Sequence, residues 1–188
     1  NRTATTIGAL PACNGGSIPF IKNEEPTNGI IYLDVGFPVD VLSVADYPVL
    51  PLFAECVTEC GWKDLDWARS AEETALYTGG IGVNLLTMEG PDTPNSRAFR
   101  QKHNWIDRDW LIFRLSMVEE QCEHALSLLR DCITGVDFSD EKRLRDLITE
   151  TENDFDSSVI PDGHIFTSTR VCAQLSRKSA VDEIWNGL

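Results

Sequence analysis

The chain has 188 residues, with 30 acidic side chains against 16 basic ones and a formal net charge of −14. This length is enough for one domain with a sizeable apolar core. The acidic balance argues against a protein that binds nucleic acid irrespective of sequence, because phosphates require a basic surface. No apolar run approaches the roughly 18 residues that a membrane-spanning helix needs, so no membrane partner is expected.

The first residues, NRTATTIGAL, contain neither an initiator Met nor the basic-then-apolar profile of a secretory signal peptide. The final residues, DEIWNGL, end within the last predicted helix. We therefore expect a piece of a longer protein that is not secreted.

Cysteine usage indicates a reducing compartment. The six cysteines are Cys13, Cys56, Cys60, Cys122, Cys132 and Cys172. None are spaced as Cys-x-x-Cys, and four lie on predicted apolar helix faces, where a free thiol packs as a small hydrophobic group. Free cysteines are therefore favoured over a disulfide framework, and a cytoplasmic or organellar location is expected.

The chain begins with an extended region. Residues 1–16 show no apolar periodicity and are predicted to be a linker or tail. Ser17–Asn23 is a strand candidate, and Gly29–Phe37 alternates apolar side chains more clearly, as a strand does. These two strands are expected to form a hairpin.

Tyr47–Gly61 carries a clear amphipathic pattern and is predicted to be one helix that packs on the core. The apolar positions that share its inward face are Val49, Phe53, Cys56, Val57 and Cys60. Gly61 suits the end of a helix, because glycine adopts the left-handed conformation without a Cβ penalty.

A second helix is predicted over Asp64–Tyr77, followed by strands over Gly80–Met88 and Asp109–Met117. The two strands are expected to pair as a hairpin with a long polar loop. That loop holds a basic island, which consists of Arg97, Arg100, Lys102, His103 and Arg108. A solvated loop is the simpler interpretation of the island, and a contact with another domain or an acidic segment is the alternative.

Helical patterns close the chain. They cover Glu119–Thr134, a helix that begins after Ser139, and one or two helices within residues 164–185. The order of strands and helices predicts an α+β layer fold, with an antiparallel or mixed sheet of about four to five strands covered by helices. Residues 17–188 are expected to form this single domain.

Three stretches together resemble one known family: EEPTNGIIYLDVGFPVD (24–40), YPVLPLFAECVTECG with LYTGGIGVNL (47–61 and 76–85), and VIPDGHIFTSTRVCAQLSRKSAVDEIWNGL (159–188). They resemble the presequence-protease branch of the insulinase/pitrilysin zinc metallopeptidases, the inverzincins. The resemblance covers nearly the whole chain past residue 17 and implies a LuxS/insulinase-type α+β domain. In that family, four homologous domains form two halves that close around a peptide-degrading chamber, and the first domain holds the zinc. The present pattern is similar to the third domain, which is not catalytic.

The family's zinc motif, H-x-x-E-H on a helix, supplies two His ligands and a Glu that acts as general base on a metal-bound water. In the family, a Cys-Gly pair often follows this motif. When CG (60–61) is aligned with that pair, the motif falls on LFAEC (52–56). Glu55 then matches the general base, whereas Leu52 and Cys56 replace the two His. Because Leu cannot bind a metal ion, the resemblance implies that this domain has no catalytic residue and binds no zinc or other cofactor. Glu55 is either a remnant of an ancestral site or an ordinary helix residue, and the sequence leaves both open.

Cys56 and Cys60 lie one turn apart and are an alternative pair of metal ligands. A site would still need His or carboxylate ligands from elsewhere in the chain, and the candidate histidines are His103, His124 and His164. The simpler interpretation is that both thiols pack in the core, because they lie on the apolar face of their helix.

The main functional expectation is a non-catalytic structural domain of an ATP-independent zinc metallopeptidase. It would wall the chamber, contact other domains of the same chain and support the enclosure of peptide substrates, while the parent's first domain holds the zinc. A second hypothesis is a non-peptidase scaffold that reuses the fold, like the core subunits of respiratory complex III. A third, a small standalone enzyme, has no set of residues in its favour. An H-x-x-E-H motif upstream in the same gene distinguishes the peptidase from the scaffold.

Overall fold

The first thirty residues form a unit of their own. The computed structural model describes residues 4–90, 93–103 and 107–187, and the chain divides into two compact units, Asn1–Ile30 and Ile31–Leu188. In the first unit, β1 (Ala4–Pro11) and β2 (Ser17–Glu24) pair in an antiparallel hairpin, with Ile7 opposite Ile21. Both strands are exposed along their whole length.

This hairpin changes two expectations. The range 1–16, expected to be a linker or tail, contains strand β1, while its residues 1–3 lie outside the described part. The predicted pairing of Ser17–Asn23 with Gly29–Phe37 is wrong, because β2 pairs with β1 and β3 (Ile30–Pro38) pairs with β6. The sequence of β1 alternates Thr, Ile, Ala and Leu only weakly, so its pattern gave no strand signal.

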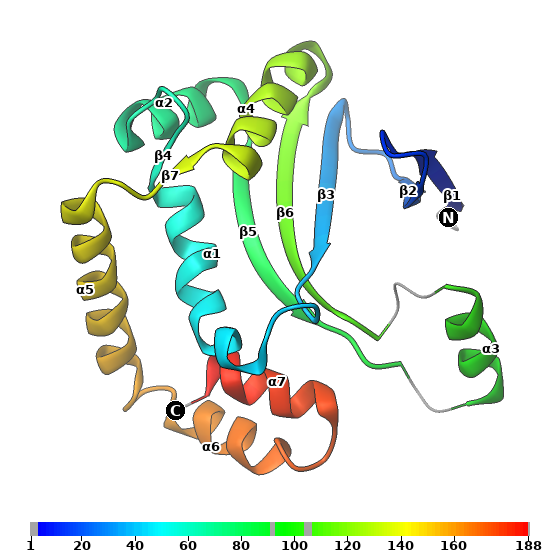
Figure 1. The fold of residues 1–188 in the computed structure, drawn as a ribbon, viewed down its shortest axis with the longest axis vertical. Coiled ribbons are helices and arrows are strands. Elements are labelled where there is room, and N and C mark those ends of the chain that lie inside the picture. Colours follow the sequence, from blue (N-terminus) through cyan, green and yellow to red (C-terminus); the bar gives the residue numbers. More distant parts are fainter. Residues whose placement is uncertain (1–3, 91–92, 104–106, 188) are drawn as a thin grey trace. The chain divides into compact units, whose positions relative to one another are not determined.

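The second unit is built on a three-stranded sheet in the order β3-β6-β5 (Figure 1). Strand β5 (Gly80–Thr87) pairs antiparallel with β6 (Asp109–Val118), which confirms the predicted hairpin with a long connection. The central strand β6 alternates strictly between buried and less buried positions, and its buried apolar residues are Leu111, Phe113, Leu115 and Met117. This alternation buries one face of the sheet and fixes the register.

The predicted sheet of about four to five strands is wrong, although the α+β class is confirmed. The described strands form three antiparallel sheets of two, three and two strands, the last from β4 (Gly61–Trp62) and β7 (Val136–Asp137). Among the described strands, β3 pairs with β6 alone.

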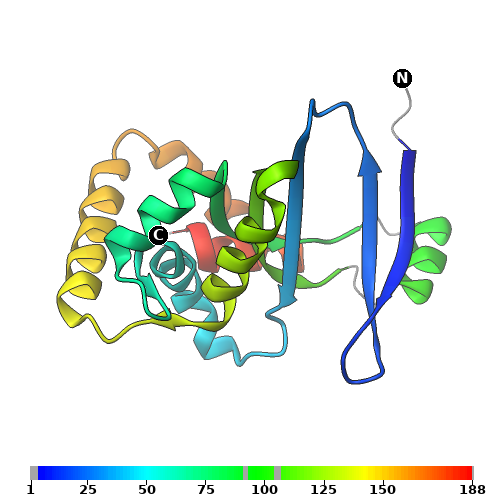
Figure 2. The ribbon, with the colours of Figure 1, turned by 90° about the horizontal axis from the view of Figure 1, so that it is seen from above.

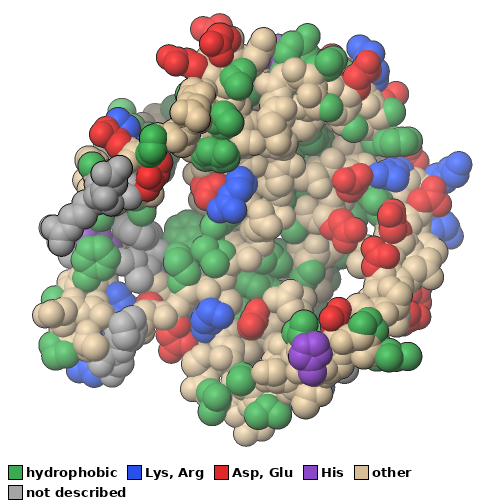
Figure 3. Space-filling model, turned by 180° about the vertical axis from the view of Figure 1, so that it is seen from behind, with side chains coloured by type: hydrophobic (Ala, Val, Ile, Leu, Met, Phe, Trp, Pro, Cys, Tyr) green, Lys and Arg blue, Asp and Glu red, His purple; other side chains and the backbone are tan. Residues whose placement is uncertain are grey.

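The larger helices gather on one face of the three-stranded sheet (Figure 2). The helices of the described part, short 3-10 segments included, are η1 (Val44–Val49), α1 (Leu50–Glu59), α2 (Trp67–Tyr77), α3 (Pro94–Lys102), η2 (Glu119–Gln121), α4 (Cys122–Thr134), α5 (Glu141–Ser158), α6 (Gly163–Cys172) and α7 (Arg177–Asn186). Helices α1 and α4 supply much of the core, with Val57, Ala125, Leu129 and Cys132 almost fully buried. Seen from behind, acidic side chains gather on the side where α5 lies (Figure 3).

The predicted helix Tyr47–Gly61 exists, but it begins as the 3-10 segment η1 and becomes α-helical at Leu50. Its inward face is also rotated from the prediction, because Val49 and Phe53 are exposed while Leu50 and Ala54 are buried. Two prolines explain the break: Pro48 and Pro51 lack the N–H that a continuous helical ladder requires, and Pro51 lies in the first turn of α1. Gly61 is required for packing, since an added Cβ would lie 2.5 Å from the Leu65 carbonyl oxygen.

In two other helices, the apolar periodicity of the sequence predicts inward residues that the structure does not bury. In α2, Ala68, Ala75 and Leu76 are exposed, and Ser70 is the buried residue of the helix. In α5, Leu147 is buried but Ile148 and Phe155 are not. Asp140, one residue beyond the expected Ser139, caps α5 by accepting a hydrogen bond from the Arg143 N–H. Each of these helices buries a narrower face than its sequence pattern suggests.

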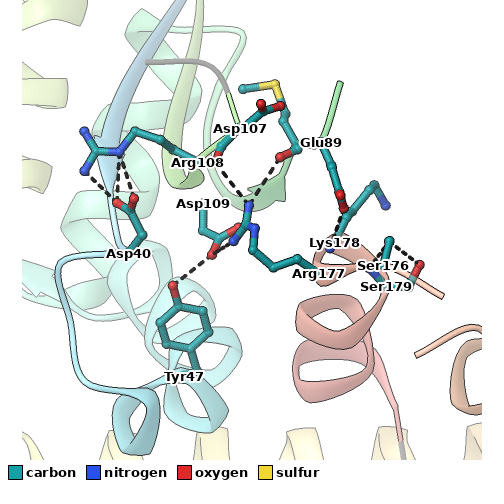
Figure 4. A network of polar contacts seen from close by, with 11 residues as sticks. Asp40, Tyr47, Glu89, Asp107, Arg108, Asp109, Ser176, Arg177, Lys178 and Ser179 are labelled. Atoms are coloured by element: carbon teal, nitrogen blue, oxygen red, sulfur yellow. Dashed lines mark hydrogen bonds and ion pairs between the residues drawn. The ribbon is translucent and has the colours of Figure 1, made fainter. Parts of the chain in front are cut away.

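A buried carboxylate joins the start of β6 to the C-terminal helix (Figure 4). The Asp109 side chain is 1% exposed, and its Oδ2 accepts hydrogen bonds from the Tyr47 hydroxyl at 2.9 Å and from Arg177 Nη1 at 2.8 Å. Arg177 Nη2 also donates to the backbone oxygens of Met88 and Asp107. The Tyr47 ring stacks on Trp185 with ring centroids 5.8 Å apart. Arg177, at the beginning of α7, therefore binds Asp109 directly, and Trp185, near its end, is connected to Asp109 through Tyr47.

These contacts shift two pKa values in opposite directions. Burial alone would raise the pKa of Asp109, but the hydrogen bonds from Arg177 and Tyr47 and the guanidinium charge outweigh it and lower the pKa. Burial, together with the neighbouring Asp109 carboxylate, raises the pKa of Tyr47 to about 12. The native state thus favours the ionised carboxylate and the neutral phenol.

Replacing the carboxylate tests its share of stability. Asp109→Asn should lower the free energy of unfolding by about 2 kcal/mol at neutral pH, because hydrogen bonds to a charged group are lost. Since the native pKa lies below the unfolded value of about 4, the wild-type advantage is fully present above that pH and shrinks as the pH falls through the native pKa. Urea unfolding of both proteins at several pH values measures this, and an advantage that stays constant to the lowest pH would contradict it.

The phenol gives the opposite pH dependence. Tyr47→Phe should cost about 1 kcal/mol, because it removes one hydrogen bond to Asp109 while keeping the stacked ring. A raised native pKa stabilises the fold below the unfolded value of about 10 and loses that contribution as the pH rises towards 12. The stability difference between wild type and Tyr47→Phe, followed by thermal unfolding from pH 8 to 11, should therefore narrow above about pH 10. A difference that widens there would show that the phenol is not held neutral.

Candidate functional site

Helix α1 presents the three motif positions in different surroundings. Leu52 is half-buried and packs against the small cluster of Cys56, Cys60 and Leu147. Cys56 is 5% exposed within that cluster. Glu55 is half-buried on another side of the helix, and its Oε2 lies 3.1 Å from the Thr151 hydroxyl of α5. That hydroxyl has one proton, which the Leu147 carbonyl oxygen at 2.9 Å can also accept.

These residues do not fit a zinc ion. Leu52 has no donor atom, and burial raises the pKa of the Cys56 thiol, which disfavours the thiolate that binds metal. Among residues 4–90, 93–103 and 107–187, no three His, Cys, Asp or Glu side chains lie close enough together to hold a metal ion.

A pocket lies beside α1, and Glu55 is on its wall. The pocket has a volume of about 480 Å³, in the range of small-ligand sites. Three elements line it: Pro51, Ala54, Glu55 and Thr58 of α1, Gly82, Val83, Asn84 and Leu85 of β5, and Asn186 of α7. The polar residues of the wall are therefore one glutamate, one threonine and two asparagines.

The pocket opens on the edge of the sheet. Side chains along a strand alternate between its two faces, so four consecutive residues, Gly82–Leu85, can line one space only at the strand's edge. Strand β5 is the outer strand of its sheet, with β6 on one side. The site thus combines a strand edge with a helix wall.

The backbone register shows which groups of β5 point into this space. The Met88 N–H donates to the Arg108 oxygen, and the two residues continue the β5–β6 register. In an antiparallel pair, residues with backbone groups turned towards the partner alternate with residues turned away. Gly82 and Asn84 therefore face β6, while the N–H and C=O groups of Val83 and Leu85 face outward.

The remaining cysteines behave as packing residues. Cys56, Cys60 and Cys132 are buried, and burial raises the pKa of each thiol, that of Cys132 to about 12. Cys122 and Cys172 are half-buried, and Cys13 is exposed in the first unit. The core interpretation of Cys56 and Cys60 is thereby supported over a metal-binding one.

The three histidines lie on separate helices. His124 on α4 packs on the Tyr77 ring, and its Nε2 lies 3.3 Å from Glu73 Oε2. His103 packs on Phe99 at the end of α3, and His164 is exposed in the first turn of α6. They do not assemble with Cys56 and Cys60.

The basic island is partly neutralised by ion pairs. Arg100 lies 2.7 Å from Asp107, and Arg108 makes a two-pronged pair with Asp40. Arg97 and His103 lie on or at the end of α3 as well, and the side chain of Lys102 lies outside the described part. Helix α3 was not predicted, although Thr93 followed by Pro94 is a typical helix start, with the Thr93 hydroxyl accepting from the Ser96 N–H.

Nearly the whole chain matches one known protein family. Residues 4–188 match the model of a family described as associated with peptidases of family M16, subfamily C. The chain belongs to this family. The resemblance to presequence proteases predicted from the sequence is confirmed.

The chain is also similar in sequence to several presequence proteases. The chain is 26% identical over 173 residues to a mitochondrial presequence protease of Danio rerio, covering 92% of the chain and 16% of that protein. It is 25% identical to presequence protease 1, chloroplastic/mitochondrial, of Arabidopsis thaliana, covering 91% and 15%. With the mitochondrial presequence protease of Mus musculus the identity is 22%, covering 92% and 16%. The chain thus spans about one sixth of the length of these relatives.

In the part of the chain that the structure describes, none of the helices has the length and apolarity to cross a bilayer.

The sequence analysis identified Glu55 but none of the other residues that line the pocket. Asn84 and Asn186 are isolated polar residues in apolar strand and helix patterns, and only their meeting in space makes them notable.

Thiol labelling tests the placement of the cysteines. In the native chain, Ellman's reagent should react quickly with one exposed thiol, Cys13, and should reach Cys56, Cys60 and Cys132 only after unfolding. A Cys13→Ser variant is the matched control, since it should remove the fast phase alone. Fast reaction of Cys56 in the folded Cys13→Ser protein would show that α1 is not packed as described.

Proposed function

We propose that this chain is a non-catalytic domain of a longer zinc metallopeptidase, where it helps to wall the chamber that encloses peptides. The family match over residues 4–188, combined with an α1 that has Leu52 and Cys56 at the motif's ligand positions, carries this proposal. The zinc of the whole protein would be held by its first domain, and this chain would occupy the place of the third.

Its partners would be other domains of the same chain. Three large apolar side chains on or next to α6 are more exposed than is usual on the solvent-facing surface of a monomeric protein: Ile160 is 92%, Val171 67% and Leu175 76% exposed. Such a surface suits burial against a neighbouring domain. The names of the relatives support peptide hydrolysis by the whole protein and a mitochondrial or plastid location.

Metal content distinguishes this role from an active one. The 188-residue chain should contain less than about 0.1 zinc per molecule and cleave no fluorogenic peptide, because α1 lacks the ligand set. The full-length protein expressed from the same gene should hold about one zinc and cleave the peptide. Elemental analysis by plasma mass spectrometry and a cleavage assay measure both.

Cys56→Ala in the full-length protein should leave the zinc content unchanged, with Cys13→Ala as the matched control. Zinc that is bound by the 188-residue chain and lost in Cys56→Ala would overturn the non-catalytic assignment. A full-length protein without zinc or cleavage would overturn the peptidase assignment and favour a scaffold.

A further inference from the structure

We propose that Asn28 is the preferred site of spontaneous deamidation in this chain, a covalent modification that adds one negative charge and reroutes the backbone. The reaction takes place between Asn28 and Gly29 and requires only water and base. This inference goes beyond the proposed function, because it involves neither zinc nor the cleavage of peptides.

Asparagine followed by glycine is the dipeptide in which this reaction meets least hindrance. Glycine has no side chain to keep its backbone nitrogen away from the preceding amide, and asparagine is one of the thermolabile residues of proteins. The chain contains three such pairs, Asn14-Gly15, Asn28-Gly29 and Asn186-Gly187. Because the three dipeptides are identical, differences in their reactivity must come from the structure around them.

The pair in the β1–β2 turn is held by two hydrogen bonds. The Gly15 N–H donates to the Ala12 oxygen at 3.0 Å. Asn14 Oδ1 accepts a hydrogen bond of 3.1 Å from the Gly16 N–H. Both the nitrogen that would attack and the side chain that would be attacked are therefore occupied, and at least one of these bonds has to open before they can react.

The pair at the end of α7 is held in the same way. The Gly187 N–H donates to the Glu183 oxygen at 2.9 Å, which continues the helical ladder. Asn186 Nδ2 donates to Asp182 Oδ1 at 2.8 Å. Reaction at this pair requires the last turn of the helix to open.

The pair between β2 and β3 is exposed and lacks these restraints. Asn28 and Gly29 both have positive φ, 52° and 85°, in a tight turn closed by a hydrogen bond of 3.2 Å from the Ile30 N–H to the Thr27 oxygen. Among the described residues, none accepts from the Gly29 N–H and none bonds the Asn28 side chain. The left-handed conformation also favours Gly over Asn, so Asn28 can leave it at little cost.

The reaction proceeds through a five-membered ring. Base removes the proton of the Gly29 N–H, and the nitrogen attacks Cγ of Asn28. A bond forms between that nitrogen and Cγ, the bond from Cγ to Nδ2 breaks, and Nδ2 leaves as ammonia. Water then opens the succinimide at Cγ, which gives aspartate, or at the backbone carbonyl carbon, which gives isoaspartate. No oxidant or reductant takes part.

The product changes the entry to β3. In isoaspartate the main chain passes through the former side chain, so the turn gains one methylene group and leaves a free carboxylate. Turn geometry sets how the following strand begins, and a longer turn no longer matches the bond between Thr27 and Ile30. The new charge also lies close in sequence to Glu24 and Glu25.

The test incubates the 188-residue chain in mildly alkaline buffer and follows each Asn-Gly peptide by mass spectrometry, with electron-transfer fragmentation to identify isoaspartate. In the native chain, Asn28 should convert at least about threefold faster than Asn14 or Asn186, since these must first lose a hydrogen bond. In urea the three rates should agree within about twofold, because no structure then separates the dipeptides. Equal rates in the native chain, or a faster reaction at Asn14 or Asn186, would overturn the proposal.

A pair of variants gives a second readout. Asn28→Gln keeps an amide but would have to close a six-membered ring, which forms much more slowly. After incubation, total isoaspartate, measured by enzymatic methyl transfer from S-adenosylmethionine, should be lower by at least about half in Asn28→Gln. It should change little in Asn14→Gln, the matched control. A decrease of the same size in Asn14→Gln, or none in Asn28→Gln, would contradict the assignment.

The pH dependence tests the route. The rate at Asn28 should rise steeply from neutral to mildly alkaline pH, because base has to remove the Gly29 proton before the ring closes. A rate that does not change with pH over this range would rule out ring closure by Gly29. None of these results depends on the zinc content or activity of the full-length protein.

Discussion

The fold of the second unit depends on one buried carboxylate. Asp109 begins the central strand β6, yet its charge is almost removed from water. Such a charge is tolerated only where it is paired, and the two donors to its Oδ2 come from η1 and α7, which are far away in sequence. The main effect of the carboxylate is therefore on the arrangement of the chain. A fold in which Tyr47 and Arg177 did not reach Asp109 would leave its buried charge unpaired. The apolar side of β6 supplies the bulk of the driving force, and Asp109 decides where the last helix is placed.

The candidate site is a product of that arrangement. Helix α1, strand β5 and helix α7 each contribute a few groups, and none of them is a site alone. The two positions aligned with zinc ligands, Leu52 and Cys56, form part of an apolar cluster with Leu147, while Glu55 between them faces the pocket. A helix without metal ligands can therefore still form the wall of a pocket.

Much of the sheet could be predicted from the sequence, because β6 alternates strictly and its burial follows that alternation. The partner of β2 could not, since a hairpin exposed on both strands has no buried face to set a pattern. The rotation of α1 was missed because Phe53 and Val49 are as apolar as Leu50, and periodicity cannot rank equivalent faces. Glu55 was found through the family motif, whereas Asn186 meets the pocket only through the placement of α7. Local patterns thus indicated the elements, and long-range contacts determined the site.

Helix α7 has a mechanical consequence. It contains ten residues, so it spans roughly 15 Å from Arg177 at its beginning to Asn186 at its end. Arg177 is fixed on Asp109, and Trp185 is fixed on Tyr47, which binds the same carboxylate. The helix therefore connects the ion pair between Arg177 and Asp109 to Asn186, which lines the pocket. A substitution in this ion pair would displace the far wall without touching it, so natural variation at Asp109 or Arg177 would alter the shape of a cleft that neither residue lines.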